Sequence, residues 1–161
     1  GVQTCALPIW LGINTRAVDT LDAAVRDADI VDLANTNRGP MLQRSQLKPG
    51  ALLVSMTENQ FGPDFVGTTR PVFLTWDTVA ANQFPREPWH TPIKAGTLTR
   101  ADLAAELGEV IAGEKDPRRT PDDVVVYEIT AFGLHDLAVA QWAYQWARQQ
   151  GVGQPFVLSR E

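Results

Sequence analysis

The chain has 161 residues, of which 44% are hydrophobic and 20% charged, a composition typical of one globular domain with a sizeable core. Its net charge of −5, with no basic cluster larger than the pair Arg118 and Arg119, argues against a nucleic-acid partner. No apolar run approaches the roughly 18 residues of a membrane span, and the single cysteine, Cys5, fits a reducing, cytoplasmic setting.

The first ten residues, GVQTCALPIW, show neither helical nor strand periodicity. They resemble the translation of a sequencing adapter, so we treat residues 1–10 as a non-native leader and leave them out of fold reasoning. We therefore expect the natural start of the product to be missing.

The remaining sequence alternates short apolar strands with short helices, which predicts an α/β domain with a mostly parallel sheet. Thr20 or Asp19, Asp77 and Thr99 are the expected helix caps. Strands are expected at 30–34, 51–56, 72–76 and 124–129, with a strand end at 17–18, and helices at 21–28, 78–83 and 100–112, with a helical turn within 41–47.

The stretch 124–148 predicts a buried strand that runs directly into a long helix. Stepping that helix at about 100° per residue gives a wide apolar arc that includes Trp142 and Trp146, so a partner surface should cover it. Its first turn carries His135 and Asp136. Two interpretations stay open, because these residues could complement the helix dipole and a nearby carbonyl or could face a ligand.

Several other polar or aromatic residues are not promoted to a functional site. His90 lies in a Pro-rich stretch and is expected at the surface or an edge. Trp76 and Trp89 are expected to be packing residues, and Glu106 and Glu109 to form a solvated helix face.

Three stretches together resemble the carboxyl-terminal part of the ornithine cyclodeaminase and mu-crystallin family, over about residues 17–158. The resemblance implies an incomplete Rossmann-type NAD(P)-binding domain at 11–135, and a returning helix and tail at 136–161 that pack toward a missing substrate and dimerisation domain. It also accounts for the absence of a G-x-G-x-x-G motif, which would lie upstream. The stretches are DADIVDLANTNRGPML (27–42), LKPGALLVSM (47–56) and ADLAAELGEVIAGEKDPRRTPDDVVVYEITAFGLHDLAVAQWAYQWARQQGVG (101–153).

The same resemblance assigns cofactor contacts to three turns that follow predicted strands. Residues of the first turn would lie along the dinucleotide, and those of the other two near the nicotinamide. Ala131 replaces a family glycine, which would hinder close approach of the backbone. The residues are Ala34, Asn35 and Thr36; Ser55, Met56 and Thr57; and Thr130 and Ala131.

The catalytic residues implied by the resemblance are Asn59 and Asp136. Asn59 stands where the cyclodeaminases carry the aspartate that works on the substrate amine, and an amide cannot exchange a proton in that role. Asn59 therefore speaks against ornithine cyclodeamination and would instead hold the substrate nitrogen by a hydrogen bond. Glu58 could supply a carboxylate in its place, and His135 could exchange protons near neutral pH.

The resemblance implies an NAD- or NADP-dependent enzyme that acts on an amino acid, its cyclic imine or its keto acid, and that is a cytoplasmic homodimer at full length. The 161-residue chain alone is expected to be inactive, and it lacks the residue that would separate NAD from NADP. The alternative is a non-catalytic, mu-crystallin-like NAD(P)H carrier. A third interpretation is an unrelated Rossmann-like domain such as a methyltransferase.

Overall fold

A computed structural model describes residues 12–37, 39–81, 85–129, 133–154 and 156. These residues fall into two compact units, one within residues 1–130 and one within 131–161. The leader predicted at residues 1–10 lies outside the described residues. None of the helices in the described part of the chain is long and apolar enough to cross a membrane.

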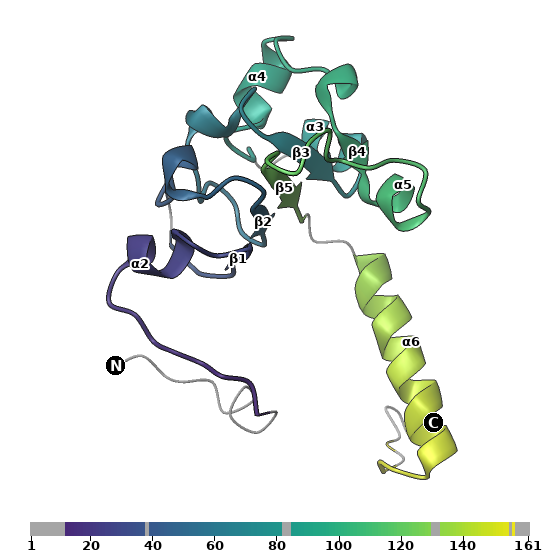
Figure 1. The fold of residues 1–161 in the computed structure, drawn as a ribbon. Coiled ribbons are helices and arrows are strands. Elements are labelled where there is room, and N and C mark those ends of the chain that lie inside the picture. The colour runs from purple at the N-terminus through teal and green to yellow at the C-terminus, as the bar shows by residue number, and fades with distance from the viewer. Residues whose placement is uncertain (1–11, 38, 82–84, 130–132, 155, 157–161) are drawn as a thin grey trace. The chain divides into compact units, whose positions relative to one another are not determined.

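The first unit is built on a five-stranded, wholly parallel sheet in the order β1-β2-β5-β3-β4, with β5 lying between β2 and β3 (Figure 1). The predicted α/β class and parallel sheet are confirmed. The strands are β1 (Ile30–Leu33), β2 (Leu52–Ser55), β3 (Arg70–Phe73), β4 (Ala105–Glu106) and β5 (Val125–Glu128).

Short helices connect the strands. Thr20 and Thr75 are the N-caps of the first two, each accepting a hydrogen bond from a backbone N–H of the first turn, so the expected cap at Asp77 is wrong. The helices are α2 (Leu21–Val25), α3 (Trp76–Ala80), α4 (His90–Lys94) and α5 (Leu107–Ile111), with 3-10 turns η1 (Arg44–Gln46), η2 (Pro63–Phe65) and η3 (Arg100–Asp102).

The helix predicted at 100–112 is not continuous. Residues 100–102 form η3, after which Ala105 and Glu106 add β4 to the edge of the sheet beside β3, and helix α5 begins at Leu107. The apolar spacing that suggested one helix is overridden by strand pairing. Residues 17–18, expected to end a strand, are not in a strand.

The core centres on Trp89, which is fully buried. Its ring lies 5.9 Å from that of Phe61 and 5.7 Å from that of Phe73, and Phe61 packs 4.7 Å from Phe65. Burying one Trp removes about 150–250 Å² from water, worth about 4–6 kcal/mol at about 25 cal/mol per Å². Trp89 is thus a packing residue, as predicted, and it fixes the start of α4.

His90 follows Trp89 and begins α4. Its side chain is buried, with 6% of the residue exposed, so the expectation of a surface or edge position is wrong. The insertion of Trp89 into the core draws the first turn of α4 inward with it. The Pro-rich composition of this stretch suggested a surface loop and gave no sign that the residues are buried.

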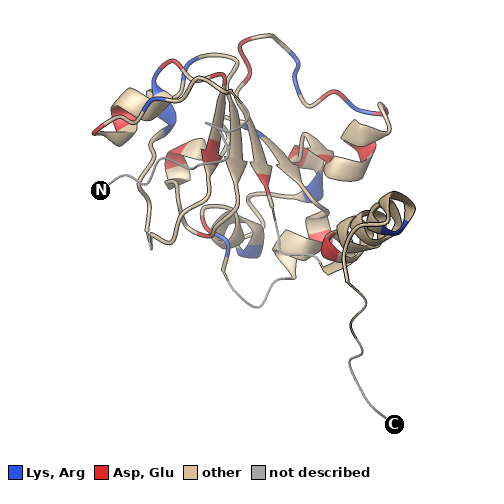
Figure 2. Ribbon diagram, turned by 90° about the horizontal axis from the view of Figure 1, so that it is seen from below, with Lys and Arg blue, Asp and Glu red and all other residues tan. Residues whose placement is uncertain are grey.

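The second unit consists of the helix α6 (Gly133–Gln150). The Asp, Glu, Lys and Arg residues of this helix are Asp136 in its first turn and Arg148 in its last, so the helix is almost entirely tan in Figure 2. Its large apolar side chains are exposed, Trp142 at 66% and Trp146 at 48%. The sequence predicts a wide apolar arc on this helix, and its large apolar side chains are exposed among the described residues.

Candidate active site

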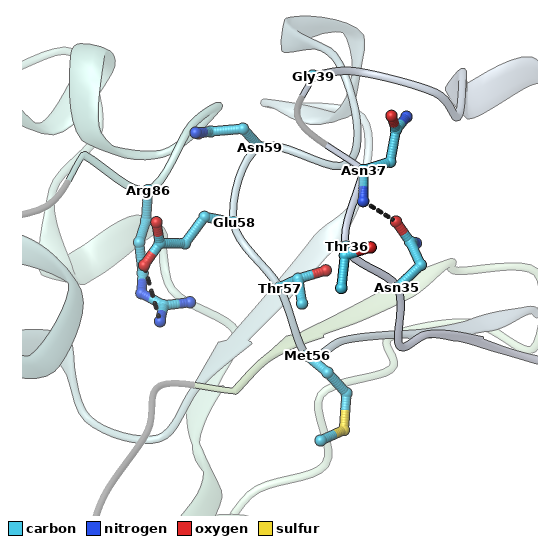
Figure 3. A pocket seen from close by; sticks show the side chains of 9 residues that line it. All are labelled: Asn35, Thr36, Asn37, Gly39, Met56, Thr57, Glu58, Asn59 and Arg86. Atoms are coloured by element: carbon cyan, nitrogen blue, oxygen red, sulfur yellow. Dashed lines mark hydrogen bonds and ion pairs between the residues drawn. The ribbon is translucent and has the colours of Figure 1, made fainter.

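A cavity of about 700 Å³ opens at the carboxyl ends of β1 and β2. Because the two strands are parallel neighbours, the loops that follow them meet at one edge of the sheet. Arg86 reaches this cavity from the segment that precedes α4 (Figure 3). The lining residues are Asn35, Thr36, Asn37 and Gly39 after β1, Met56, Thr57, Glu58 and Asn59 after β2, and Arg86.

The loop after β1 folds back on itself through Asn35. The backbone N–H of Asn37 donates to Oδ1 of Asn35 at 2.8 Å, and the Asn35 amide donates to the sulfur of Met41 at 3.5 Å. An asparagine that bonds its own backbone two residues on forms a stable turn without needing a strand or helix. This turn holds Thr36 at the rim of the cavity.

Gln60, which sequence analysis did not single out, joins the two loops. Its buried amide donates to the backbone oxygens of Asn37 at 2.6 Å and Glu58 at 3.0 Å. Its own backbone oxygen accepts from the N–H groups of Met41 and Leu42. One side chain and one carbonyl thus fix the distance between the two walls of the cavity.

Asn59 lines the cavity and has a left-handed backbone with φ of 60°, a conformation that asparagine adopts more readily than most residues. Its Oδ1 accepts a hydrogen bond from the backbone N–H of Glu87 at 3.0 Å. The side chain therefore ties the loop after β2 to the segment before α4. Figure 3 shows it turned away from the hydroxyl of Thr36.

Arg86 and Glu128 form a buried ion pair with Nη1 and Oε1 2.8 Å apart, and their side chains are 7% and 2% exposed. The indole N–H of Trp89 donates to the other oxygen of Glu128 at 3.3 Å, and Arg86 also donates to the carbonyl of Ile129 at 3.1 Å. Burial raises the pKa of the Glu128 carboxyl to about 7, against the opposing pull of Arg86 and the Trp89 and Ser55 hydrogen bonds.

Glu58 meets the opposite side of the guanidinium. Its Oε1 lies 3.5 Å from Nη2 of Arg86, and the Glu58 side chain is 42% exposed. In Figure 3, the Glu58 side chain extends toward Arg86. The hydroxyl of Thr57 lies on the other side of the loop. Arg86 thus bridges one buried carboxylate and one carboxylate that lies in the cavity.

The structure brings together five of the residues selected from the sequence, because Asn35, Thr36, Met56, Thr57 and Asn59 all line the cavity. Two others lie beside it.

Ala34 does not line the cavity, and Ser55 is buried with its hydroxyl donating to the backbone oxygen of Thr57 at 3.0 Å. Thr130 and Ala131 lie outside the described residues, and Asp136 lies in the first turn of α6, in the second unit. The roles assigned to all these residues stay predictions.

Two solved structures share the fold over almost the whole chain. The Thermococcus litoralis Δ1-pyrroline-2-carboxylate reductase in complex with NADH and L-proline aligns with a TM-score of 0.77 and 22% identity, covering 93% of this chain and 47% of that one. The Paracoccus denitrificans iminosuccinate reductase in complex with NAD⁺ aligns with a TM-score of 0.70 and 27% identity, covering 92% and 46%. With a parallel sheet and a polar cavity at its carboxyl edge, the first unit is a Rossmann-type α/β domain.

The chain belongs to the ornithine cyclodeaminase/mu-crystallin family, whose model matches residues 2–151. Among curated proteins, the iminosuccinate reductase of Paracoccus denitrificans is 34% identical over 149 residues, 89% of this chain and 44% of the relative. A Δ1-pyrroline-2-carboxylate reductase of Bacillus cereus is 36% identical over 63 residues, 39% of this chain and 19% of the relative. The chain spans less than half the length of these relatives.

Proposed function

We propose that this chain is the cofactor-binding part of a nicotinamide-dependent enzyme that reduces the C=N bond of an imino acid to give an amino acid. The observation that carries the proposal is the cavity itself, where five residues selected from the sequence converge at the carboxyl ends of adjacent parallel strands. The relatives named as reductases of iminosuccinate and of Δ1-pyrroline-2-carboxylate support it.

The polar lining of the cavity fits the nicotinamide carboxamide and the ribose of NAD or NADP. Its volume of about 700 Å³ falls in the usual range for small-molecule sites, about 300–1,000 Å³. The amides and hydroxyls of Asn35, Thr36 and Thr57 can donate to and accept from the carboxamide and ribose hydroxyls. Among the described lining residues the cation is Arg86, and its guanidinium is engaged by carboxylates.

The nicotinamide would supply the hydride, and the chain would supply orientation and electrostatics. Thr36 and Thr57 would hold the cofactor against the ends of the strands. Asn59, with Oδ1 engaged by Glu87, would offer its amide N–H groups to an acceptor on the substrate such as a carboxylate oxygen. Asp136, in the first turn of α6, would have the catalytic role that the family resemblance implies. The complete enzyme would act as a homodimer.

A non-catalytic NAD(P)H carrier is the second candidate. One observation favours it: Asn59, at the position where the resemblance implies the acid of the cyclodeaminases, lines the cavity as an amide, which cannot transfer a proton. A carrier would bind the cofactor and leave every imine unchanged.

The test uses the full-length gene product. Titration with NADH and NADPH, followed by nicotinamide fluorescence, should show saturable binding. Oxidation of bound NADH should then be followed with Δ1-pyrroline-2-carboxylate and iminosuccinate as separate substrates, and ammonia release from ornithine should be measured in the presence of NAD⁺. Reduction of at least one imine is expected. Saturable binding with no turnover of any substrate would support the carrier, and absence of binding would contradict both.

A further inference from the structure

Glu58 is the one carboxylate among the described residues that line the cavity. It is 42% exposed, so its oxygens are accessible from the cavity. Asn59, the neighbouring residue, has a neutral amide whose oxygen is engaged by the N–H of Glu87. Of these two adjacent residues, Glu58 alone carries a carboxyl group, the kind of group that can transfer a proton.

Glu58 is held loosely, as a group that must move toward a ligand needs to be. Its 3.5 Å separation from Nη2 of Arg86 exceeds the usual 2.7–3.2 Å of an N–H···O hydrogen bond. A half-exposed ion pair of this kind stabilises a protein little, so Glu58 can turn toward a bound molecule at small cost. Arg86 itself stays in place, because Glu128 and the carbonyl of Ile129 hold its other nitrogen.

The charges at this end of the cavity favour a nitrogen over a carboxylate. With Glu58 protonated and Glu128 ionised, the group formed by these two residues and Arg86 is neutral. After Glu58 has given up its proton, the group carries one net negative charge. In neither state does this group carry a net positive charge that would attract an anion, and the Arg86 side chain is only 7% exposed. A basic imine nitrogen, which becomes positively charged on protonation, fits this environment.

We infer that Glu58 is the acid that protonates the substrate nitrogen; this inference rests on the proposed imine reduction. Bound NAD(P)H would supply a hydride, with its electron pair, to the imine carbon, where a C–H bond forms. The π pair of the C=N bond moves to nitrogen, which takes the proton of the Glu58 carboxyl. The products are an amine, oxidised NAD(P) and the Glu58 carboxylate, which regains its proton from solvent through the exposed side of the cavity.

The test compares E58Q, E58D and E58A with the wild type in the full-length gene product, using the imine that the wild type reduces. E58Q keeps size and hydrogen bonding but cannot give up a proton, so we expect kcat to fall about 10²- to 10⁴-fold, the usual loss of a general acid. NADH affinity should stay as in the wild type, which shows that the site is folded. E58D should keep measurable turnover, and formate should restore part of the activity of E58A.

The matched control is E114Q, the same substitution at an exposed residue that does not line the cavity. It should leave kcat unchanged. An E58Q enzyme with kcat within about threefold of an active wild type would overturn the inference and leave imine reduction standing. E58A insensitive to formate, with E58D as slow as E58Q, would assign Glu58 a structural role and also overturn it. A wild type that binds NADH but reduces no imine would overturn the proposed function and this inference together.

Discussion

Arg86 and Glu128 place charged groups in the interior, where burial removes their hydration and costs free energy. Each is compensated by the other at 2.8 Å, and Trp89 and Ile129 supply further hydrogen bonds. Removing one partner of such a pair leaves a buried charge unpaired, which typically costs about 3–5 kcal/mol.

We predict that R86M destabilises the protein by about 3–5 kcal/mol at pH 8 and by clearly less at pH 5. Burial raises the pKa of Glu128 from its ordinary 4.5 to about 7, so between these values the folded state holds more protons than the unfolded state. This group therefore makes the protein less stable as pH rises through that window. Loss of Arg86 removes the largest opposing influence and deepens the fall.

Urea unfolding of the wild type and R86M at the two pH values measures this difference. The double variant R86M/E128Q is the control, since it carries no ionisable group at position 128 and should lose the extra pH dependence. An R86M cost that is equal at pH 5 and pH 8 would contradict the assignment of the effect to Glu128.

At the residue scale, residues that line the cavity could be predicted from the sequence, but the buried ion pair beside it could not. The apolar runs placed two loops after strands, and the family resemblance selected Asn35, Thr36, Met56, Thr57 and Asn59 on those loops. The buried pair of Arg86 and Glu128 joins residues 42 positions apart, and no local pattern marks such a contact. The available signal was Glu128, a charged residue inside the apolar run 124–129.

At the scale of elements, the loops after β1 and β2 act as one unit because Gln60 binds both. The substitution Q60M keeps volume but removes the donors to Asn37 and Glu58. It also removes an acceptor, Oε1 of Gln60, that is buried without a hydrogen-bond partner among the described residues, which offsets part of the loss.

We therefore predict that Q60M lowers the free energy of unfolding by about 1 kcal/mol and weakens NADH binding, because the two cavity walls separate. Urea unfolding and NADH titration of the same preparations measure the two effects. Q46M, at a half-exposed glutamine of η1 that does not line the cavity, is the matched control for binding. A Q60M protein that binds NADH as tightly as the wild type would show that the loops keep their spacing without this side chain.

The elements themselves were predictable where burial and period agree. Strands β1, β2 and β5 were located within one or two residues, because continuous apolar runs between polar turns suit a strand covered on both faces. The region 100–112 was not, since its apolar spacing fits a helix and only the pairing of Val72 with Ala105 makes a strand there.

For the molecule as a whole, alternation of strands and helices indicates a parallel sheet but not its strand order. The last strand in sequence, β5, lies between β2 and β3. Its register places Glu128 beside Ser55 of β2 and Phe73 of β3. That insertion is a property of the complete sheet, and it brings Glu128 to the edge where the cavity opens.

The exposed apolar side chains of α6 govern how whole molecules behave in solution. Leu137, Val139, Trp142, Tyr144 and Trp146 are each about half to two-thirds exposed. Burying the exposed part of each Trp, about half to two-thirds of roughly 150–250 Å², would gain about 2–4 kcal/mol at about 25 cal/mol per Å². A contiguous apolar surface of this kind promotes association. The net charge of −5 opposes association, but salt screens that repulsion.

We predict that the 161-residue chain self-associates in a concentration-dependent manner, that added salt strengthens the association, and that W142Q/W146Q weakens it at least tenfold, the equivalent of about 1.4 kcal/mol. Sedimentation velocity over a range of concentrations and salt measures it. The control Q141S/Q145S changes two polar residues of the same helix and should associate like the wild type. Association that weakens as salt is added would mean that charge, and not the apolar face of α6, holds the molecules together.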